Sequence, residues 1–303
     1  MDLRQLAALL AVADHGSFSA AAKALYTVQS NVSAHVQRLE SELGAVLIDR
    51  ARGQLTAAGQ LVAVRARRIQ AELDAMPTDL SAAVGQLTGE VRFGVIGTTA
   101  RWLMPQFLNL LRETHPGVRV VVMEASTTSL VPQVEDGRLE LAVLNLPIES
   151  PELLSVPLFD EDLVCIVGAT HGLANHPSVS VADLAKFDLM LPPPGTALRR
   201  DLEDQARKAR VTLKVLAEID GGRLMTSLAM EGYAAAVVPA TAAPRWVKGE
   251  FQVIPVEGLP RRRVGLAQRR RTTLSAAGQA VVDVLTVVTR EKGALQPGVF
   301  VTV

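Results

Sequence analysis

The sequence predicts a chain of α + α/β class: a small helical unit, one long helix, and a larger half in which strands alternate with helices. Three observations predict it. Two short helical patterns lie on either side of a polar break between residues 17 and 40. Apolar residues then recur at helical spacing from Ala57 to about Leu87, and strand-like and helical segments alternate after Gly89.

Length and composition exclude several classes of protein. At 303 residues the chain exceeds one usual core, so more than one domain is expected. The 31 basic and 31 acidic residues leave no net charge, so nucleic-acid binding must come from local arrangement. The single cysteine, Cys165, permits no internal disulfide. No run approaches the ~18 apolar residues that span a bilayer, and the N-terminus lacks a signal-peptide core. We expect a cytoplasmic protein that does not bind membranes.

Apolar residues at helical spacing predict three helices near the N-terminus. Leu3, Leu6, Leu9, Leu10 and Ala13 share one helical face, and His15-Gly16 ends that helix. A short helix follows behind a cap at Ser17 or Ser19, with Phe18, Ala21, Ala22 and Leu25 on its apolar face. After Tyr26-Thr27-Val28, a second helix buries a narrow stripe of Val32, Val36, Leu39 and Leu43. Its outer face carries amides, hydroxyls and an arginine, which suit base edges in a major groove and equally suit a plain solvated surface. Spacing alone leaves both interpretations open.

The next segments predict a hairpin and a long helix. Leu47-Ile48 and Leu55 flank basic residues at a turn, as in a wing that touches DNA, and Thr56 caps the helix after it. The apolar stripe of that helix is narrow, which favours pairing with a second copy over burial on its own domain. Pro77 should kink or split it.

The C-terminal half alternates strands and helices as an α/β sheet does. Strands are predicted at 91–96, 118–123, 139–144, 163–167, 213–218, 235–238 and 264–268. Helices are predicted from about 98 to 111 and at 127–136, 198–209, 222–231 and 275–290, and 294–303 reads as an irregular tail.

This order of parts resembles the LysR-type transcriptional regulators. The N-terminal likeness lies in LRQLAALLAVADHGSFSAAAKAL, VQSNVSAHVQRLESELGAVLIDR and LTAAG, which are similar to that family's winged helix-turn-helix. The rest of the chain carries EVRFGVIGTTARWLMPQFLNLLRETHPGVRV, VEDGRLELAVLNLP, EDLVCIVGATHGLA, MEGYAAAVVP and RRRTTLSAAGQAVVDVL, which are similar to its effector-binding half. Each motif is weak alone, but their order along nearly the whole chain is specific.

The resemblance implies a DNA-binding regulator, not an enzyme, that forms a dimer or tetramer on a partly palindromic double-stranded site, with RNA polymerase as a candidate further partner. It implies a winged helix-turn-helix at 1–58 and a linker helix at 59–88. An effector half similar to periplasmic binding proteins would follow, with subdomain I at 90–161 and 267–292 and subdomain II at 162–266. Crossover strands are expected near Asp162 to Ile166 and near Val264 to Gln268. No cofactor is expected beyond a small-molecule effector of unknown identity.

The chain also departs from the family's pattern. The family starts its reading helix with Ser-Gln-Pro-Ala, and the aligned residues here are Val28-Gln29-Ser30-Asn31. The N-cap serine is therefore missing, and Thr27 or Ser30 is expected to cap instead. The segment between Arg50 and Leu55 is short, which predicts a short wing.

Carried over by position, the resemblance nominates the residues that would touch DNA. The groove-facing candidates are Gln29, Ser30, Asn31, Ser33 and His35. The candidates for phosphate contacts are Arg38, Arg50 and Arg52. The first 56 residues hold five basic and five acidic side chains, so one copy alone should bind DNA weakly.

Effector-binding candidates come partly from local chemistry. Thr98-Thr99 stands where a strand gives way to a helix, a place that suits a carboxylate or other anion, and the effector is expected to be an organic or aromatic acid. By the resemblance, loops at Thr127, Thr128, Asn145, Gly195 and Thr196 would line the same cleft. The side chains nominated to neutralise an acid are Arg101, Arg199 and Arg223.

Other residue patterns in the sequence predict no catalytic or metal site. Cys165 reads as a core residue, and the histidines show no metal spacing. Arg261-Arg262-Arg263 and Arg269-Arg270-Arg271 are read either as a second nucleic-acid patch or as a solvated subdomain edge, and the edge is favoured. The alternative function is an effector-binding protein or enzyme whose N-terminal helices serve oligomerisation. A polar reading helix followed by a basic wing separates the two.

Overall fold

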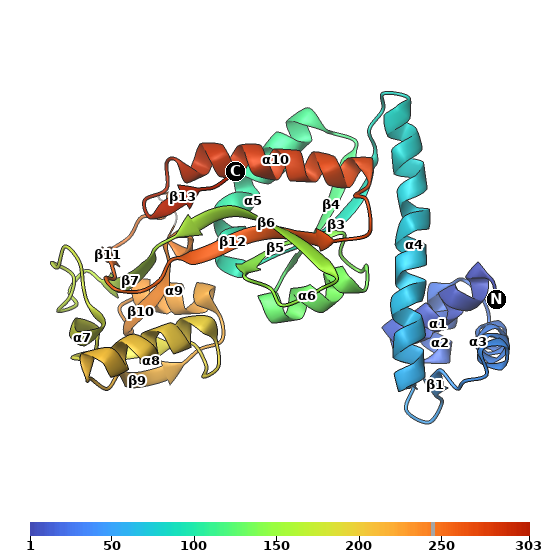
Figure 1. Cartoon of the computed structure of the whole chain (residues 1–303), viewed down its shortest axis with the longest axis horizontal. Coiled ribbons are helices and arrows are strands. Elements are labelled where there is room, and N and C mark those ends of the chain that lie inside the picture. The colour runs from blue at the N-terminus through green and yellow to red at the C-terminus, as the bar shows by residue number, and fades with distance from the viewer. Residues whose placement is uncertain (244–245) are drawn as a thin grey trace.

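The computed structural model describes residues 1–243 and 246–303, and it divides them into a small helical unit, a long helix and a larger α/β half (Figure 1). The helical unit lies to one side of the long helix and the α/β half lies to the other (Figure 1). The predicted α + α/β class is confirmed.

The helical unit is three helices and a two-stranded hairpin. It comprises α1 (Leu3–His15), α2 (Phe18–Ala24), α3 (Gln29–Leu43), β1 (Ile48–Asp49) and β2 (Gln54–Leu55). Leu9, Val36 and Leu39 are fully buried in its separate core. The predicted helix-turn-helix and short wing are both present. Leu3 and Leu43, expected in the core, are 53% and 42% exposed because they lie at helix ends beyond the packed turns.

Capping differs from the prediction at one helix. Ser17 caps α2 by accepting a hydrogen bond from the backbone N–H of Ala20 at 3.1 Å. Neither Thr27 nor Ser30 caps α3, because Val28 occupies the N-cap position and forms no side-chain cap. The side chain of Asn31 instead donates to the hydroxyl of Thr27 at 3.0 Å. The start of α3 is therefore held in part by Asn31, which is itself a candidate for DNA contact.

The long helix α4 (Ala57–Ala83) links the two parts of the molecule and is capped by Thr56 as predicted. Pro77 lies inside α4 without splitting it, since a proline removes only one backbone donor and the next residue, Thr78, is buried against Gly89. The only fully buried residues of α4 are Gly59, Ala63, Ala66 and Thr78. Leu61, Met76 and Leu80 are more than half exposed, so the alternative of a helix buried on its own domain is wrong.

The first sheet of the α/β half has six strands in the order β13-β6-β12-β5-β3-β4. They are β3 (Gly89–Val95), β4 (Val118–Glu124), β5 (Leu141–Leu146), β6 (Leu153–Glu161), β12 (Arg262–Arg269) and β13 (Val299–Val301). β3 runs parallel to β4 and β5, and β12 runs antiparallel to β5 and β6. The accompanying helices are α5 (Gly97–Thr114), α6 (Thr127–Glu135) and α10 (Ala276–Gly293). A core that includes Trp102, Phe107 and Phe159 joins these helices to the sheet.

The second sheet has five strands in the order β11-β7-β10-β8-β9. They are β7 (Leu163–Gly168), β8 (Asp188–Leu191), β9 (Lys214–Glu218), β10 (Ala235–Pro239) and β11 (Phe251–Pro255). Its helices are α7 (Val181–Leu184), α8 (Ala197–Ala209) and α9 (Gly222–Met230), and η1 (Ala240–Ala242) follows β10. Apolar cores lie on both of its sides, so the sheet is buried between helices.

The chain passes between the two sheets at Asp162 and again between β11 and β12. The second passage was expected at Val264 to Gln268, but all of β12 pairs with β5 and β6 in the first sheet. The crossing therefore lies at 256–261, and the strand is not a connector. An apolar run in the sequence indicates that a strand is buried. The sheet to which the strand belongs is known only from the strands that pair with it.

The C-terminal segment is more ordered than the predicted irregular tail. β13 pairs antiparallel with β6, with Phe300 opposite Asp160. The buried side-chain amide of Gln296 donates to the carbonyls of Ala240 and Ala243 in the second lobe. The end of the chain thus contacts both lobes beside the passage at Asp162.

Candidate functional site

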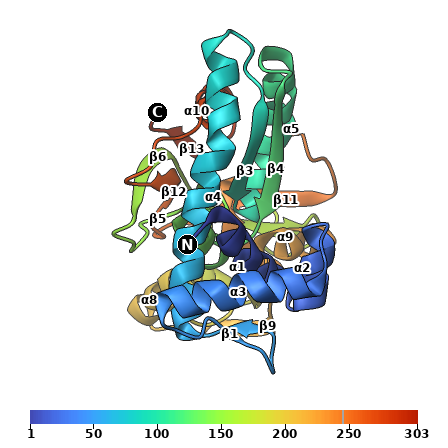
Figure 2. The ribbon, with the colours of Figure 1, turned by 90° about the vertical axis from the view of Figure 1, so that its right-hand side faces the viewer.

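Helix α3 and the adjoining hairpin lie side by side at one end of the molecule (Figures 1 and 2). The narrow stripe of Val32, Val36 and Leu39 is at most 1% exposed and holds α3 against the other helices. Because a narrow stripe buries only one side of a helix, the rest of α3 remains available to a partner.

The predicted groove-facing residues divide into two groups. Gln29, Ser30 and Asn31 are exposed in the first turn of α3. Ser33 and His35 are half-buried, and Nδ1 of His35 is enclosed without a hydrogen-bond partner. The first turn of α3 therefore presents the more accessible amides and hydroxyl.

The three candidate phosphate contacts also differ. Arg38 is exposed on α3. The side chain of Arg52 is 77% exposed at the wing and approaches Asp49 at 3.7 Å. Arg50 is held by other side chains of the helical unit: its guanidinium donates to Ser33 at 3.1 Å and lies 5.2 Å from the ring centre of Phe18.

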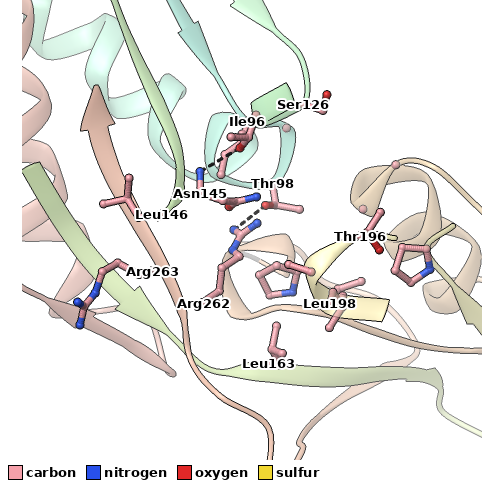
Figure 3. Close-up of a pocket in the computed structure, with 18 of the residues that line it drawn as sticks. Ile96, Thr98, Ser126, Asn145, Leu146, Leu163, Thr196, Leu198, Arg262 and Arg263 are labelled. Carbon is pink, nitrogen blue, oxygen red and sulfur yellow. Dashed lines mark hydrogen bonds between the residues drawn. The ribbon is translucent and has the colours of Figure 1, made fainter. Parts of the chain in front are cut away.

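A second site is the cleft between the two α/β lobes, with a cavity of about 1230 Å³. Thr98 and Asn145 line one side from the first lobe, and Thr196 and Leu198 line the opposite side from the second (Figure 3). A cavity of this size, lined by apolar side chains and a few polar groups, accommodates a small organic molecule.

Five of the ten predicted effector-binding residues line this cavity: Thr98, Thr127, Asn145, Thr196 and Arg223. Thr127 accepts a hydrogen bond from the backbone N–H of Asn145 at 3.1 Å, and the side-chain oxygen of Asn145 is buried without a donor. The five that do not line it are Thr99, Arg101, Thr128, Gly195 and Arg199. Thr99 is fully buried, because its neighbour Thr98 takes the side of α5 that faces the cleft.

Arg199 cannot neutralise a ligand as predicted, because it already has partners. It donates to Glu203 at 2.6 Å, to Glu218 at 3.0 Å and to the carbonyl of Pro192. Partial burial opposes a charge on Arg199, but the two carboxylates outweigh it and raise the pKa of the guanidinium. This ion-pair network stabilises the start of α8.

The chain's first arginine run forms a ladder with three consecutive acids. Arg261 pairs with Asp162, Arg262 with Glu161 and Arg263 with Asp160. All three arginines line the cleft. The predicted solvated edge is wrong at Arg262, whose side chain is 18% exposed and whose partner Glu161 is fully buried.

Arg262 is a cleft residue that the sequence did not nominate. Its guanidinium donates to the hydroxyl of Thr98 at 2.9 Å (Figure 3). The carboxylate of Glu161 also accepts from the backbone N–H of Thr241 in the second lobe at 2.9 Å. The signal that would have found this site is the match of the run 261–263 with the acidic run 160–162 across antiparallel strands.

In the second arginine run, Arg270 and Arg271 are exposed as predicted, but Arg269 is not part of a solvated edge. Arg269 is 7% exposed and donates to the backbone carbonyls of Val134 and Leu139. Burial lowers the pKa of its guanidinium. Arg269 therefore holds α6 against the first sheet and is not available to nucleic acid.

Two helix starts face the cleft without side-chain caps. α5 begins after Ile96 and α9 begins after Gly221, and neither residue forms a side-chain cap. The first backbone N–H groups of a helix have no partner within it, and they favour negative charge. Arg223, in the first turn of α9, pairs across the cleft with Glu124 at the end of β4.

Gly222 allows the start of α9 to approach the start of α5. A Cβ atom on Gly222 would lie 3.0 Å from the methyl of Thr98 in the other lobe. The lobes therefore touch at this edge of the cleft, and the close approach depends on Gly222.

Cys165 lies in the middle of β7 and is fully buried. Burial raises the pKa of its thiol to about 12. Among the described residues no three His, Cys, Asp or Glu side chains gather as a metal site, and no helix is long and apolar enough to span a membrane.

Two family models match the chain. The bacterial regulatory helix-turn-helix protein model of the lysR family matches residues 3–60. The LysR substrate binding domain model matches residues 85–289. Together they cover the helical unit and most of the α/β half.

Similar proteins of full length are also known. A probable hydrogen peroxide-inducible genes activator of Streptomyces viridosporus is 33% identical over 279 residues, which is 88% of each chain. The DNA-binding transcriptional dual regulator OxyR of Escherichia coli (strain K12) is 28% identical over 289 residues, covering 94% of this chain and 95% of that one.

Solved structures share the whole architecture. A full-length OxyR of Pseudomonas aeruginosa with a cysteine replaced by aspartate superposes with a TM-score of 0.76 at 23% identity, covering 96% of this chain and 95% of that one. Full-length CbnR, a LysR family regulator, complexed with its target DNA has a TM-score of 0.67 at 25% identity and covers 96% and 100%. The chain belongs to the LysR family of DNA-binding transcriptional regulators, and is not an enzyme.

Proposed function

We propose that this regulator is controlled by a small organic acid bound in the cleft between its two lobes, and that it acts on DNA as a dimer or tetramer in the cytoplasm. The observation that carries the proposal is the cavity of about 1230 Å³ with the uncapped start of α5 at its wall. Backbone N–H groups at such a helix start bind carboxylates well.

Thr98 would add a hydrogen bond to the same carboxylate. Its oxygen accepts from Arg262, so its hydroxyl proton is free to be donated into the cleft. Thr127, Asn145 and Thr196 supply further polar groups from both lobes. An acid would also compete with Glu124 for Arg223, which couples binding to the contact between the lobes. A change in that contact would reach the DNA-reading units through α4, and would alter any contact with RNA polymerase.

Hydrogen peroxide is the second candidate signal, because relatives are named for it. A solved OxyR of Corynebacterium glutamicum is described as bound to H2O2. Oxidation of a cysteine needs a thiolate, however, and Cys165 is buried with its pKa raised to about 12. Cys165 is also the only cysteine in the sequence, so no second thiol can resolve an oxidised one. We therefore favour reversible binding of an acid over thiol oxidation.

The test is a thermal-shift screen of small aliphatic and aromatic carboxylates, followed by calorimetry of each compound that raises the melting temperature. Thr98→Val should abolish or strongly weaken the heat of binding. Thr99→Val is the matched control, because Thr99 has the same side chain but does not line the cavity. Equal binding by wild type and Thr98→Val would contradict the proposal. So would a response to peroxide that disappears in Cys165→Ala.

A further inference from the structure

One side-chain cluster ties the wing to the reading helix. It consists of Phe18 of α2, Ser33 and Glu40 of α3, and Arg50 at the turn of the wing. Ser33 and Glu40 are seven residues apart, so they lie about two helical turns from one another on nearly the same flank. The guanidinium of Arg50 reaches both, at 3.1 Å from the hydroxyl of Ser33 and 3.4 Å from a carboxylate oxygen of Glu40.

Glu40 fixes the beginning of the wing. One of its oxygens accepts hydrogen bonds from the backbone N–H groups of Leu47 at 2.8 Å and Ile48 at 3.2 Å. Its side chain is only 13% exposed. A carboxylate with several donors in a partly buried place holds its geometry firmly. The distance between α3 and the wing is thus set by Glu40.

Arg50 is held on three sides. Besides Ser33 and Glu40, it lies over the ring of Phe18 with 5.2 Å between the guanidinium carbon and the ring centre. The negative charge of Glu40 also offsets the charge that Arg50 would offer to a phosphate. Arg52, two residues further along the wing, has a side chain that is 77% exposed. Arg50 is therefore fixed within the helical unit, whereas Arg52 is available to contact a phosphate.

The contact with Arg50 determines how Ser33 can form hydrogen bonds. A guanidinium only donates, so the serine oxygen acts as the acceptor in this contact. The hydroxyl proton must then point elsewhere, and Ser33 is presented as a donor. Acceptors on base edges in the major groove are N7 of either purine, O6 of guanine and O4 of thymine.

We propose that Arg50, fixed by Glu40, is a positioning residue that holds Ser33 as a hydrogen-bond donor for one base in each half-site, and that it is not a phosphate contact. Arg50 then contributes to sequence preference, whereas Arg52 contributes to affinity for any DNA. This inference rests on the DNA-binding surface and is independent of the effector proposed for the cleft.

The experiment uses the full-length protein and a duplex selected by the wild type from a random library. Binding to this duplex and to an unrelated duplex of the same length is measured from about 50 to 200 mM salt. Selection is repeated with Ser33→Ala, Arg50→Gln and the matched control Arg52→Gln. Circular dichroism melts show whether each variant is folded.

Arg50→Gln should weaken binding to the selected duplex about tenfold, the effect of one lost base contact, and leave unrelated DNA and the salt slope unchanged. It should relax preference at the same base pair as Ser33→Ala. Arg52→Gln should weaken both duplexes alike and lower the salt slope by about 1. The double variant of Ser33→Ala and Arg50→Gln should lose no more affinity for the selected duplex than the weaker-binding single variant does.

A lower salt slope and equal losses on both duplexes in Arg50→Gln would overturn the proposal. Additive losses in the double variant would do the same. If Arg50→Gln does not fold, Arg50→Lys decides, because lysine keeps the charge but cannot reach Ser33 and Glu40 with a planar fork. The lysine variant should lose the same base preference, and a lysine variant with full preference would show that charge alone is sufficient.

Discussion

Glu161 is a fully buried carboxylate, and its ion pair with Arg262 offsets the free-energy cost of burying that charge. Arg262→Ala leaves the charge without its guanidinium, so the free energy of unfolding should fall by about 3–5 kcal/mol. Urea denaturation followed by circular dichroism measures it. Adding Glu161→Gln should restore much of the loss, because the amide carries no charge.

The neighbouring pair provides the control. Arg263 is 55% exposed, so Arg263→Ala should cost about 0–1 kcal/mol. Its hydrogen bonds lower the pKa of Asp160, so this stabilisation is present above the pKa of an unfolded aspartate. It is lost as the pH falls through the lowered pKa of the folded state. Equal costs for Arg262→Ala and Arg263→Ala at neutral pH would show that the burial of Glu161 is unimportant.

Cys165 should be chemically silent in the folded protein. With the pKa of its thiol raised to about 12, only about one molecule in ten thousand carries a thiolate at pH 8. We expect no alkylation by iodoacetamide under native conditions and complete alkylation in denaturant, measured by mass spectrometry. Peroxide treatment of the folded protein should add no oxygen to Cys165. Rapid native alkylation would instead show that the strand β7 opens to solvent.

The site was predictable from the sequence only where its chemistry is local. Thr98 was found because a strand-to-helix junction with hydroxyls is visible in a few residues, and it lines the cavity. The sequence predicts that Arg199 neutralises an acid, but Glu203 and Glu218 pair with it in the folded protein. Arg262 was missed because Glu161 is about one hundred residues away in the chain. Pairings of this kind depend on strand register, which composition does not reveal.

At the scale of elements, the start of α3 lacks a stabilising side-chain cap. Val28 stands at the N-cap with extended backbone angles, is 58% exposed and makes no cap. Val28→Ser should supply the missing hydrogen bond and raise the free energy of unfolding of the helical unit by about 0.5–2 kcal/mol. Thermal melts measure the gain. Val46→Ser, at a similarly exposed valine outside any helix, should give none. No gain in Val28→Ser would mean that Asn31 and Thr27 already satisfy this turn.

Element prediction succeeded where a segment carries its own periodicity. The helices at 222–231 and 275–290 are predicted within a few residues of their bounds, because their apolar faces, and for the second helix its cap at Ser275, are local features. The sequence does not predict β6, β8, β11 or α7, and it predicts an irregular tail where β13 forms. β13 has only three residues and exists through its pairing with β6, so no pattern within 299–301 distinguishes it from a loop.

At the scale of the whole molecule, we expect the outer face of α4 to pair with a second copy. Leu61, Ile69, Met76 and Leu80 are 40–74% exposed along one helix, a stripe that a second copy would cover. The double variant Ile69→Glu with Leu80→Glu should be monomeric by light scattering. It should keep its fold, because neither side chain is buried. Gln60→Glu, which adds a charge at an exposed polar position of α4, should leave the oligomer intact.

The monomeric variant also tests the prediction that one copy alone binds DNA weakly. The first 56 residues carry no net charge, so a single reading unit gains little from phosphates and depends on a few base contacts. Linking two units raises avidity about 10²–10⁴-fold without any new contact. Ile69→Glu with Leu80→Glu should therefore lose operator affinity by a factor in that range. Affinity for unrelated DNA, measured alongside by fluorescence anisotropy, should also fall, because two linked units gain avidity on any duplex that both can contact. If the monomer instead retained full operator affinity, the helix-turn-helix would have to supply all the binding energy alone, which its neutral surface and uncapped α3 argue against.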